Sequence, residues 1–448
     1  MNIGTSIATR QLGFWMCVAL VVGNIIGSGI FLLPASLAPY GLNSVWAWLL
    51  TSTGALVLAV VFAGLSRAFP SAGGPYAYTR TAFGDLTAFI VIWGYWISNW
   101  VGNAALATAA VSYLSSLLPW MAESPGISAV VTLGFLWLLT AINIYGVRAA
   151  SKLQLVTTIL KLLPLLSIAG LGVYLAMTGS SQLHNSHLAS THFNLGSVTA
   201  AATLTLWALC GLESAAVVAE KVKDPERNIP RATIVGTALS AVIYILSCTA
   251  VLALIPGDQL AQSKAPFADA AGLFWGSSVA HWFALFAAIS CLGALNGWIL
   301  LNGELTLQLA KSGLLPNMLA RESARRTPTF ALCLIGILTT ILVLMNYRKS
   351  MTDIFTFMIL LSTTAALVMY LVCSLAALKL LLSGEIAAGR RTVWLAMAGV
   401  LGTLYALWTL FGAGKEAVIW GAALLLAGFP VYFWQKAARG RDVVTSRR

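Results

Sequence analysis

Two short stretches of this 448-residue chain place helix-interrupting residues and polar groups in apolar surroundings. The first runs from Gly23 to Gly29 (Gly-Asn-Ile-Ile-Gly-Ser-Gly), and its three glycines are poor helix formers. The second is Cys210-Gly211, followed by the carboxylate of Glu213. A broken helix frees backbone amides, which attract an anion, and carbonyls, which attract a cation. An α-amino acid carries a carboxylate and an ammonium group on one carbon, so one such gap can hold both.

The rest of the chain predicts a membrane environment for these stretches. Hydrophobic residues make up 59% of the sequence and charged residues 9%, whereas a soluble domain carries about 25% charged residues. Apolar runs of about 20 residues, separated by short polar segments, are typical of transmembrane helices. We therefore predict an all-α membrane protein with twelve transmembrane helices and without a soluble domain. The predicted spans are 12–39, 43–68, 84–118, 126–145, 151–178, 195–221, 230–255, 278–311, 327–346, 353–382, 391–411 and 416–436.

The net charge of +12 is explained by membrane topology and does not indicate nucleic-acid binding. With these spans, most of the 26 lysines and arginines fall in loops on one side of the membrane. Lys264, Arg348, Lys349 and Lys415 fall on the other side, and Lys161 lies within a span. Because basic loops stay in the cytoplasm, both termini are predicted to be cytoplasmic.

The two interrupted stretches lie in predicted spans one and six. Glycines also let membrane helices approach closely, so either stretch alone is open to interpretation as a packing contact. Interrupted helices at corresponding positions of two halves favour an inverted-repeat transporter with its site at the membrane midplane. Glu213 supports this hypothesis, because a charge at mid-membrane costs at least ~2.5 kcal/mol and usually marks function.

Other classes of membrane protein fit less well. A membrane-embedded enzyme needs clustered acid, base, nucleophile or metal residues, which the sequence lacks. A channel usually needs repeated filter elements or rings of charge, and an ATP-driven pump needs a phosphate-binding loop motif. The six cysteines lie within predicted spans without metal-ligand spacing. We therefore expect neither a metal nor a cofactor.

Several motifs resemble the amino acid–polyamine–organocation (APC) family. They are Gly23-Asn-Ile-Ile-Gly-Ser-Gly-Ile-Phe31, Phe69-Pro-Ser-Ala-Gly-Gly-Pro-Tyr-Ala-Tyr78, Leu206-Trp-Ala-Leu-Cys-Gly-Leu-Glu-Ser214, Val222-Lys-Asp-Pro-Glu-Arg-Asn-Ile-Pro230 and Cys291-Leu-Gly-Ala-Leu-Asn-Gly-Trp298. The match is strongest to the bacterial arginine/agmatine, lysine/cadaverine and putrescine/ornithine antiporters. It implies one transporter domain over 1–448, with a five-plus-five inverted repeat (12–178 and 195–382) and two additional helices (391–436). Helices 1 and 6 would be discontinuous, and the protein would lie in a bacterial inner membrane.

The resemblance also implies which residues bind the substrate. Ile25, Ser28 and Gly29 would hold its carboxylate, carbonyls near Ile25, Trp207 and Cys210 would take its ammonium group, and Trp298 would stack on a cationic side chain. The full implied set is Asn24, Ile25, Ser28, Gly29, Ser98, Asn99, Asn103, Trp207, Cys210, Trp298 and Ser362.

Further residues would control the transport cycle. The resemblance implies gating roles for Trp207, for Tyr76 nearer the external side and for Tyr95 nearer the pocket. Glu213 matches a carboxylate linked to protons and pH. Lys161 matches a lysine of the family's broader amino acid exchangers, and we expect it to replace a sodium ion by donating to carbonyls around Gly23 to Ile26, helped by Ser290. Glu304 is a further acidic residue whose role the sequence leaves open.

These observations favour a sodium-independent exchanger of a cationic amino acid (arginine, lysine or ornithine) for another amino acid or its amine. The alternative is an exchanger or permease of broader or neutral specificity, because Leu106 and Lys161 depart from the arginine-exchanger pattern. The expected partners are a small amino acid or polyamine substrate and the lipid bilayer. A homodimer through the last two helices is what the resemblance suggests.

Overall fold

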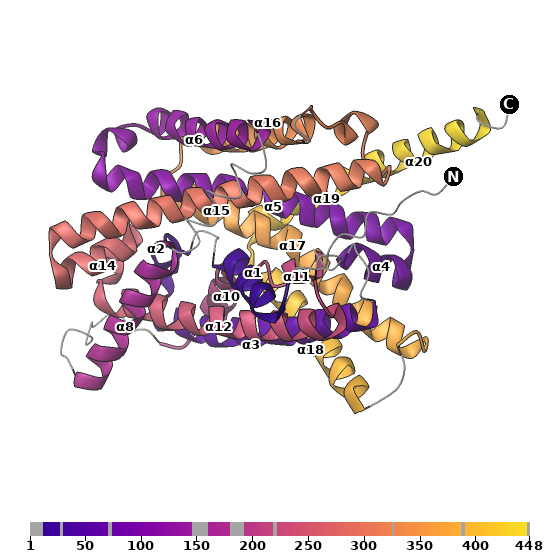
Figure 1. Cartoon of the computed structure of the whole chain (residues 1–448). Coiled ribbons are helices and arrows are strands. Elements are labelled where there is room, and N and C mark those ends of the chain that lie inside the picture. Colours follow the sequence, from indigo (N-terminus) through magenta and orange to yellow (C-terminus); the bar gives the residue numbers. More distant parts are fainter. Residues whose placement is uncertain are drawn as a thin grey trace.

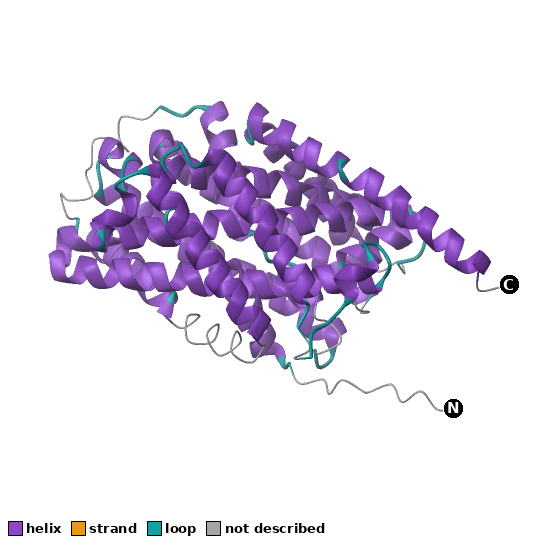
Figure 2. Ribbon diagram, turned by 90° about the horizontal axis from the view of Figure 1, so that it is seen from above, coloured by secondary structure: helices purple, strands orange, loops and turns teal. Residues whose placement is uncertain are grey.

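The computed structural model describes residues 12–26, 30–69, 74–145, 160–179, 192–217, 222–324, 327–386 and 390–445. These residues form helices joined by short loops, with one isolated backbone bridge between Leu12 and Val222 (Figure 2). The longer helices are α3 (Leu42–Ala68), α5 (Asp85–Leu117), α6 (Pro125–Tyr145), α8 (Leu162–Thr178), α10 (Leu195–Leu209), α12 (Pro225–Leu254), α15 (Ser277–Lys311), α16 (Thr329–Asn346), α17 (Met351–Leu382), α18 (Arg390–Gly412), α19 (Lys415–Leu426) and α20 (Gly428–Thr445).

The shorter elements lie at the breaks and in the connections. They are α1 (Phe14–Ile25), α2 (Leu33–Leu37), α4 (Pro75–Phe83), α11 (Ser214–Val217), α13 (Gly257–Ala261) and α14 (Pro266–Trp275), with the 3₁₀ turns η1 (Ala38–Tyr40), η2 (Pro119–Ala122) and η5 (Asn317–Ala320). The segment 256–277 lies between two predicted spans and is expected to be a loop. Most of it forms the helices α13 and α14. Both have prolines near their starts, where a missing amide hydrogen costs no helical bond.

Nine helices of the described chain are long and apolar enough to cross a membrane. They comprise α3, α6, the α10–α11 pair, α12, α15, α16, α17, α18 and the α19–α20 pair. Of the three other predicted spans, 12–39 and 151–178 contain the shorter apolar helices α1 and α8. The third corresponds to α5, whose 33 residues would suffice for a crossing. Polar residues such as Ser98, Asn99 and Asn103 lower the hydropathy of α5, which is not among the nine candidates.

The helices are arranged in layers (Figure 1). α6 and α16 pack together on the outside of α5 and α15, while α3, α12 and α18 lie on the opposite side of the bundle. α1, α10 and α17 occupy the centre, where α17 packs along α5 and α10 packs along α3. α4 and α20 lie at one end of the bundle, at the right in Figure 1, and α14 lies at the other. The central helices α1, α10 and α17 thus carry described candidate residues from spans one, six and ten.

Both predicted helix interruptions are present. α1 ends at Ile25, and the chain becomes helical again at Leu33. α10 ends at Leu209, Cys210 is extended (ψ 144°), and α11 starts at Ser214. The half-helices pack crosswise: α1 contacts α11, and α2 contacts α10. Beyond α1 and α11, the amide of Lys223 donates to the carbonyl of Leu12 at 2.9 Å.

The two interruptions meet at Gly211. Its φ of +109° is rarely adopted by residues that carry a side chain. A Cβ there would also lie 3.3 Å from the carbonyl carbon of Asn24 and 3.4 Å from the amide nitrogen of Ile25. These are backbone atoms, which cannot move aside as a flexible side chain can. Glycine is therefore required at this position both by conformation and by the closeness of the two breaks.

We expect Gly211→Ala to destabilise the folded protein by about 1–3 kcal/mol, the usual cost of an unfavourable backbone conformation. The measurement is the apparent melting temperature of the detergent-purified protein. Gly134→Ala is the matched control, because a Cβ at Gly134 on α6 would meet no atom within 4 Å. Equal melting temperatures of the two variants would contradict this account of Gly211.

Candidate substrate-binding site

The central cavity lies beside the interruption of span six. Its lining is contributed by α5, α15, α17 and the α10–α11 segment. The lining residues are Tyr95, Ser98, Asn99, Gly102, Leu106, Trp207, Cys210, Glu213, Trp298, Ser362, Ala366 and Tyr370. The cavity volume is about 30 Å³, which is room for one or two water molecules. The lining side chains must therefore separate for a molecule as large as an amino acid to bind.

The structure gathers most of the candidate residues that the sequence analysis names. Ser98, Asn99, Trp207, Cys210, Trp298 and Ser362 line the cavity together with Tyr95 and Glu213. Asn24 and Ile25 lie at the end of α1 against Gly211, and Asn103 is fully buried on α5. Ser28 and Gly29 lie outside the described residues.

Trp207 is held across the cavity by a hydrogen-bond network among three helices. Its indole nitrogen donates to the hydroxyl of Ser362 at 3.2 Å. Ser362 donates in turn to the carbonyl of Ser98 at 2.8 Å. The Ser362 hydroxyl has a single hydrogen, so the 3.0 Å contact between the two serine hydroxyls has Ser98 as donor. α5, α10 and α17 are thus joined at the candidate site.

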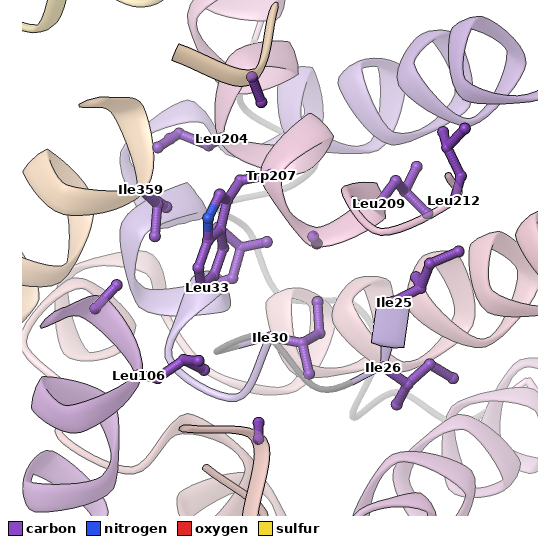
Figure 3. Close-up of a cluster of buried hydrophobic side chains, with 14 of the residues drawn as sticks. Ile25, Ile26, Ile30, Leu33, Leu106, Leu204, Trp207, Leu209, Leu212 and Ile359 are labelled. Atoms are coloured by element: carbon purple, nitrogen blue, oxygen red, sulfur yellow. The ribbon is translucent and has the colours of Figure 1, made fainter. Parts of the chain in front are cut away.

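Trp207 also has an apolar environment. Its ring lies edge-on to Phe355, with centroids 5.6 Å apart. Figure 3 shows Trp207 among Leu33, Leu204 and Ile359, all members of the main buried cluster. Trp207 is 4% exposed and lines the cavity. One hydrogen bond and apolar contacts therefore hold the indole in place.

Glu213 lies in the turn between α10 and α11 and is 1% exposed. Tyr370 of α17 donates its hydroxyl hydrogen to the carboxylate at 3.0 Å. Tyr370 is not among the candidates expected from the sequence, although it lies eight residues after Ser362, about two turns along the same helix face. Tyr370 therefore connects the buried acid to the helix that anchors Trp207.

Carbonyl groups freed by the interruption of span one are paired with distant side chains. The ammonium group of Lys161, which is 2% exposed, donates to the carbonyl of Gly23. The hydroxyl of Tyr244 on α12 donates to the carbonyl of Ile25 at 2.8 Å. Beyond the gap, the hydroxyl of Tyr113 donates to the carbonyl of Phe31 at 2.7 Å. The hydroxyl of Ser290, expected to assist Lys161, donates to the carbonyl of Phe286 within α15.

Tyr76 is placed away from the central cavity. It lies on α4 and lines a separate cavity with Arg80, Asp85, Tyr432 and Lys436. Arg80 and Lys436 are among the basic residues that the charge distribution assigns to the cytoplasmic side. The structure thus separates Tyr76 from Tyr95, the other expected gating aromatic residue, which lines the central cavity.

The chemistry of the central cavity is that of a binding site. Aromatic rings, hydroxyls, one carboxamide and one carboxylate surround it. Within the described ranges, no group of three or more histidine, cysteine, aspartate or glutamate side chains is placed to hold a metal ion. The arrangement can hold a small polar molecule, and the two helix interruptions beside it provide a way for the cavity to change shape.

Comparison with known structures supports the fold. The crystal structure of a manganese transporter from Eremococcus coleocola, in complex with an aromatic bis-isothiourea substituted compound, superposes with a TM-score of 0.57. The comparison covers 98% of this chain and 100% of that chain, at 13% sequence identity. At this identity the similarity concerns the fold alone.

Sequence comparison identifies closer relatives. A protein of Bacillus subtilis (strain 168), provisionally named an arginine/ornithine antiporter, is 34% identical over 84% of this chain and 86% of its own length. The cadaverine/lysine antiporter of Escherichia coli (strain K12) is 32% identical over 77% of each chain. The putrescine transporter PotE of Haemophilus influenzae is 30% identical over 95% of this chain and 97% of its own. The family described as "Amino acid permease" matches residues 12–433, and the chain belongs to this family of membrane transporters.

Proposed function

We propose that this protein is a sodium-independent exchanger in a bacterial inner membrane, which carries a cationic amino acid in exchange for another amino acid or its amine. The observation that carries the proposal is the central cavity, where Trp298, Trp207 and the carboxamide of Asn99 surround a volume that contains a single acidic residue, Glu213. The relatives named as antiporters of arginine/ornithine and of cadaverine/lysine support the substrate class.

A cation can be held in such a cavity without a dedicated counter-charge. The face of a tryptophan ring attracts a cation, by about 2 kcal/mol or more when water is excluded. Trp298 is the aromatic residue that α15 contributes to the lining. The carboxylate and ammonium group of the substrate would bind at the interruptions beside Ile25 and Cys210, where helical hydrogen bonding ends.

The proposed architecture has twelve transmembrane helices in an inverted repeat, with both termini in the cytoplasm. The crosswise packing of α1 on α11 and α2 on α10 supports the repeat, because two discontinuous helices related by inversion pair in this way. α4 and α20 lie at the same end of the bundle, as cytoplasmic connections on one side would. We further propose that α18 and the α19–α20 pair face lipid or a second copy of the chain. In their most apolar stretches, only 33% and 17% of the residues are buried inside the structure.

A second candidate is exchange of neutral amino acids over a broader range. The observation that favours it is the hydrogen bond from Lys161 to Gly23, because this lysine matches the family's general exchangers. Counterflow in proteoliposomes distinguishes the two candidates. Labelled arginine is offered against internal unlabelled arginine, lysine, ornithine, agmatine, cadaverine, putrescine, leucine or alanine. Stronger exchange with leucine or alanine than with any cation would reject the cationic assignment.

Replacement of Trp298 by leucine should weaken arginine binding by about 10- to 30-fold, the effect of losing a cation–π contact of ~2 kcal/mol. Binding assays with the purified protein provide the measurement. Trp282→Leu is the control, because Trp282 lies on the same helix but is 59% exposed. Wild-type affinity for arginine in the Trp298 variant would show that stacking plays no part.

Replacement of Glu213 by glutamine should flatten the pH dependence of exchange while leaving substrate affinity within a few-fold. A carboxyl group can gain or lose a proton during the cycle, whereas a carboxamide of the same size cannot. Exchange rates are measured from pH 5 to pH 8. Tyr370→Phe, which removes the hydrogen-bond donor to Glu213, should shift the profile without flattening it. A glutamine variant with the wild-type pH profile would reduce Glu213 to a structural role.

Replacement of Lys161 by alanine should slow exchange or weaken substrate binding several-fold, although Lys161 is absent from the cavity lining. The reason is that the carbonyl of Gly23 would lose the ammonium group that fixes the end of α1. Wild-type exchange should be equal in sodium and choline buffers. Sodium-stimulated exchange by the wild type, or unchanged exchange by the variant, would argue against Lys161 as the replacement for an ion.

A further inference from the structure

The interface between α5 and α15 contains buried carboxamides without hydrogen-bond partners. Asn103 and Asn302 are both 0% exposed. Among the described residues, neither the oxygen nor the nitrogen of either side-chain amide has a partner, and the amide nitrogen of Asn99 also lacks one. More than nine in ten buried polar groups in proteins are paired. Asn103 and Asn302 are the two described residues in which both side-chain polar atoms are buried without a partner.

Two other asparagines of this protein have structural roles. Asn43 donates from its side chain to the carbonyl of His192 at 3.1 Å and accepts from the amide of Asn194 at 2.9 Å. Asn194 caps α10 by accepting from the amide of Ser197 at 2.9 Å. Asn43 thus joins two backbone segments, and Asn194 caps a helix. Asn302 has neither role.

Helix register places Asn302 beside the central cavity. The indole nitrogen of Trp96 on α5 donates to the hydroxyl of Thr306 on α15 at 2.7 Å, which brings these two residues to the same level. The helices run in opposite directions, since Tyr113 near the end of α5 accepts from the amide of Phe267, shortly before α15. Asn302 lies one turn from Thr306 and one turn from Trp298, on the same face of α15.

The facing stripe of α5 carries the other two carboxamides. Asn99 and Asn103 follow Trp96 by one and two turns, so they lie along α15 between the levels of Thr306 and Trp298. Asn99 and Trp298 both line the cavity. Asn302 and Asn103 are not part of the cavity lining. They lie next to its Trp298 end, where we expect the end of a substrate side chain to bind.

We propose that Asn302, together with Asn99 and Asn103, forms a subsite that recognises the end group of the substrate side chain. The subsite prefers a planar end group that donates and accepts hydrogen bonds. This inference rests on the proposed function and names the substrate class within it: amino acids with a guanidinium group or an uncharged ureido group, as in arginine and citrulline, ahead of those with an ammonium group, as in lysine.

The unpaired atoms explain this preference. Between them the three side chains offer amide oxygens, which accept, and amide nitrogens, which donate. A ureido group has N–H donors and a carbonyl oxygen, so it satisfies both kinds. A guanidinium presents several N–H donors in one plane and satisfies the oxygens, whereas an ammonium group is a compact, strongly hydrated charge. A ligand that cannot form these hydrogen bonds leaves the buried amides of the site unpaired. Such a site therefore discriminates strongly against that ligand.

The test is competition for binding or counterflow of labelled arginine by unlabelled arginine, citrulline, lysine and norleucine. For the wild-type protein, citrulline should compete within about 10-fold of arginine, and lysine should be at least about 10-fold weaker. Asn302→Leu, which keeps the size and removes the amide, should weaken arginine and citrulline by at least about 10-fold and change norleucine by less than 3-fold. Asn346→Leu is the control, because Asn346 lies on α16 and donates to the carbonyl of Leu342 within that helix.

The outcomes separate this inference from the proposed function. Arginine exchange in which lysine equals or exceeds arginine and citrulline fails to compete would overturn the subsite and leave the proposed function intact. Unchanged competition by arginine and citrulline in the Asn302 variant would do the same. Absence of exchange of every cationic amino acid would overturn the proposed function itself. The wild-type competition series decides the preference even if the Asn302 variant fails to fold.

Discussion

The need to satisfy backbone groups where two buried helices stop is the constraint on which the structure depends. Inside a membrane, a free carbonyl or amide finds no water to replace the lost helical bond. The ends of the first interruption are paired by Lys161, Tyr244 and Tyr113, which come from three other parts of the chain. Gly211 allows the second interruption to lie directly against the first. The surrounding helices thus fix the positions of the two interruptions relative to each other.

The central cavity follows from this arrangement. Because α10 stops at Leu209, Trp207 lies in its last turn and Glu213 follows in the connecting turn. Trp207 is bonded to Ser362 and Glu213 to Tyr370, and both partners belong to α17. A movement of the α10–α11 segment must therefore break or carry along contacts to α17. Opening of the cavity is therefore linked to α17, which packs along α5.

The polarity of α5 shows how fold and site are linked. Ser98, Asn99 and Asn103 lower the hydropathy of the helix, and they do so in its buried middle. A transmembrane helix keeps such residues only where other helices shield them from lipid, and α15 and α17 provide that shield. Ser98 and Asn99 line the central cavity. In the proposed subsite, the register with α15, fixed by Trp96 and Thr306, adds Asn302 to the asparagines of α5.

The sequence by itself determined the membrane environment, the helical class, the positions of the two interruptions and the family, because hydropathy, glycine content and motifs are local properties of the chain. It also named most of the cavity lining, through motifs in single helices. It missed Tyr370, Tyr244 and Asn302. These residues are identified by contacts between distant segments, such as Tyr370 with Glu213, 157 residues apart, and Tyr244 with Ile25, 219 residues apart. Such contacts are decided only when the helices pack, because side-chain fit between distant segments sets the rotation and register of each helix.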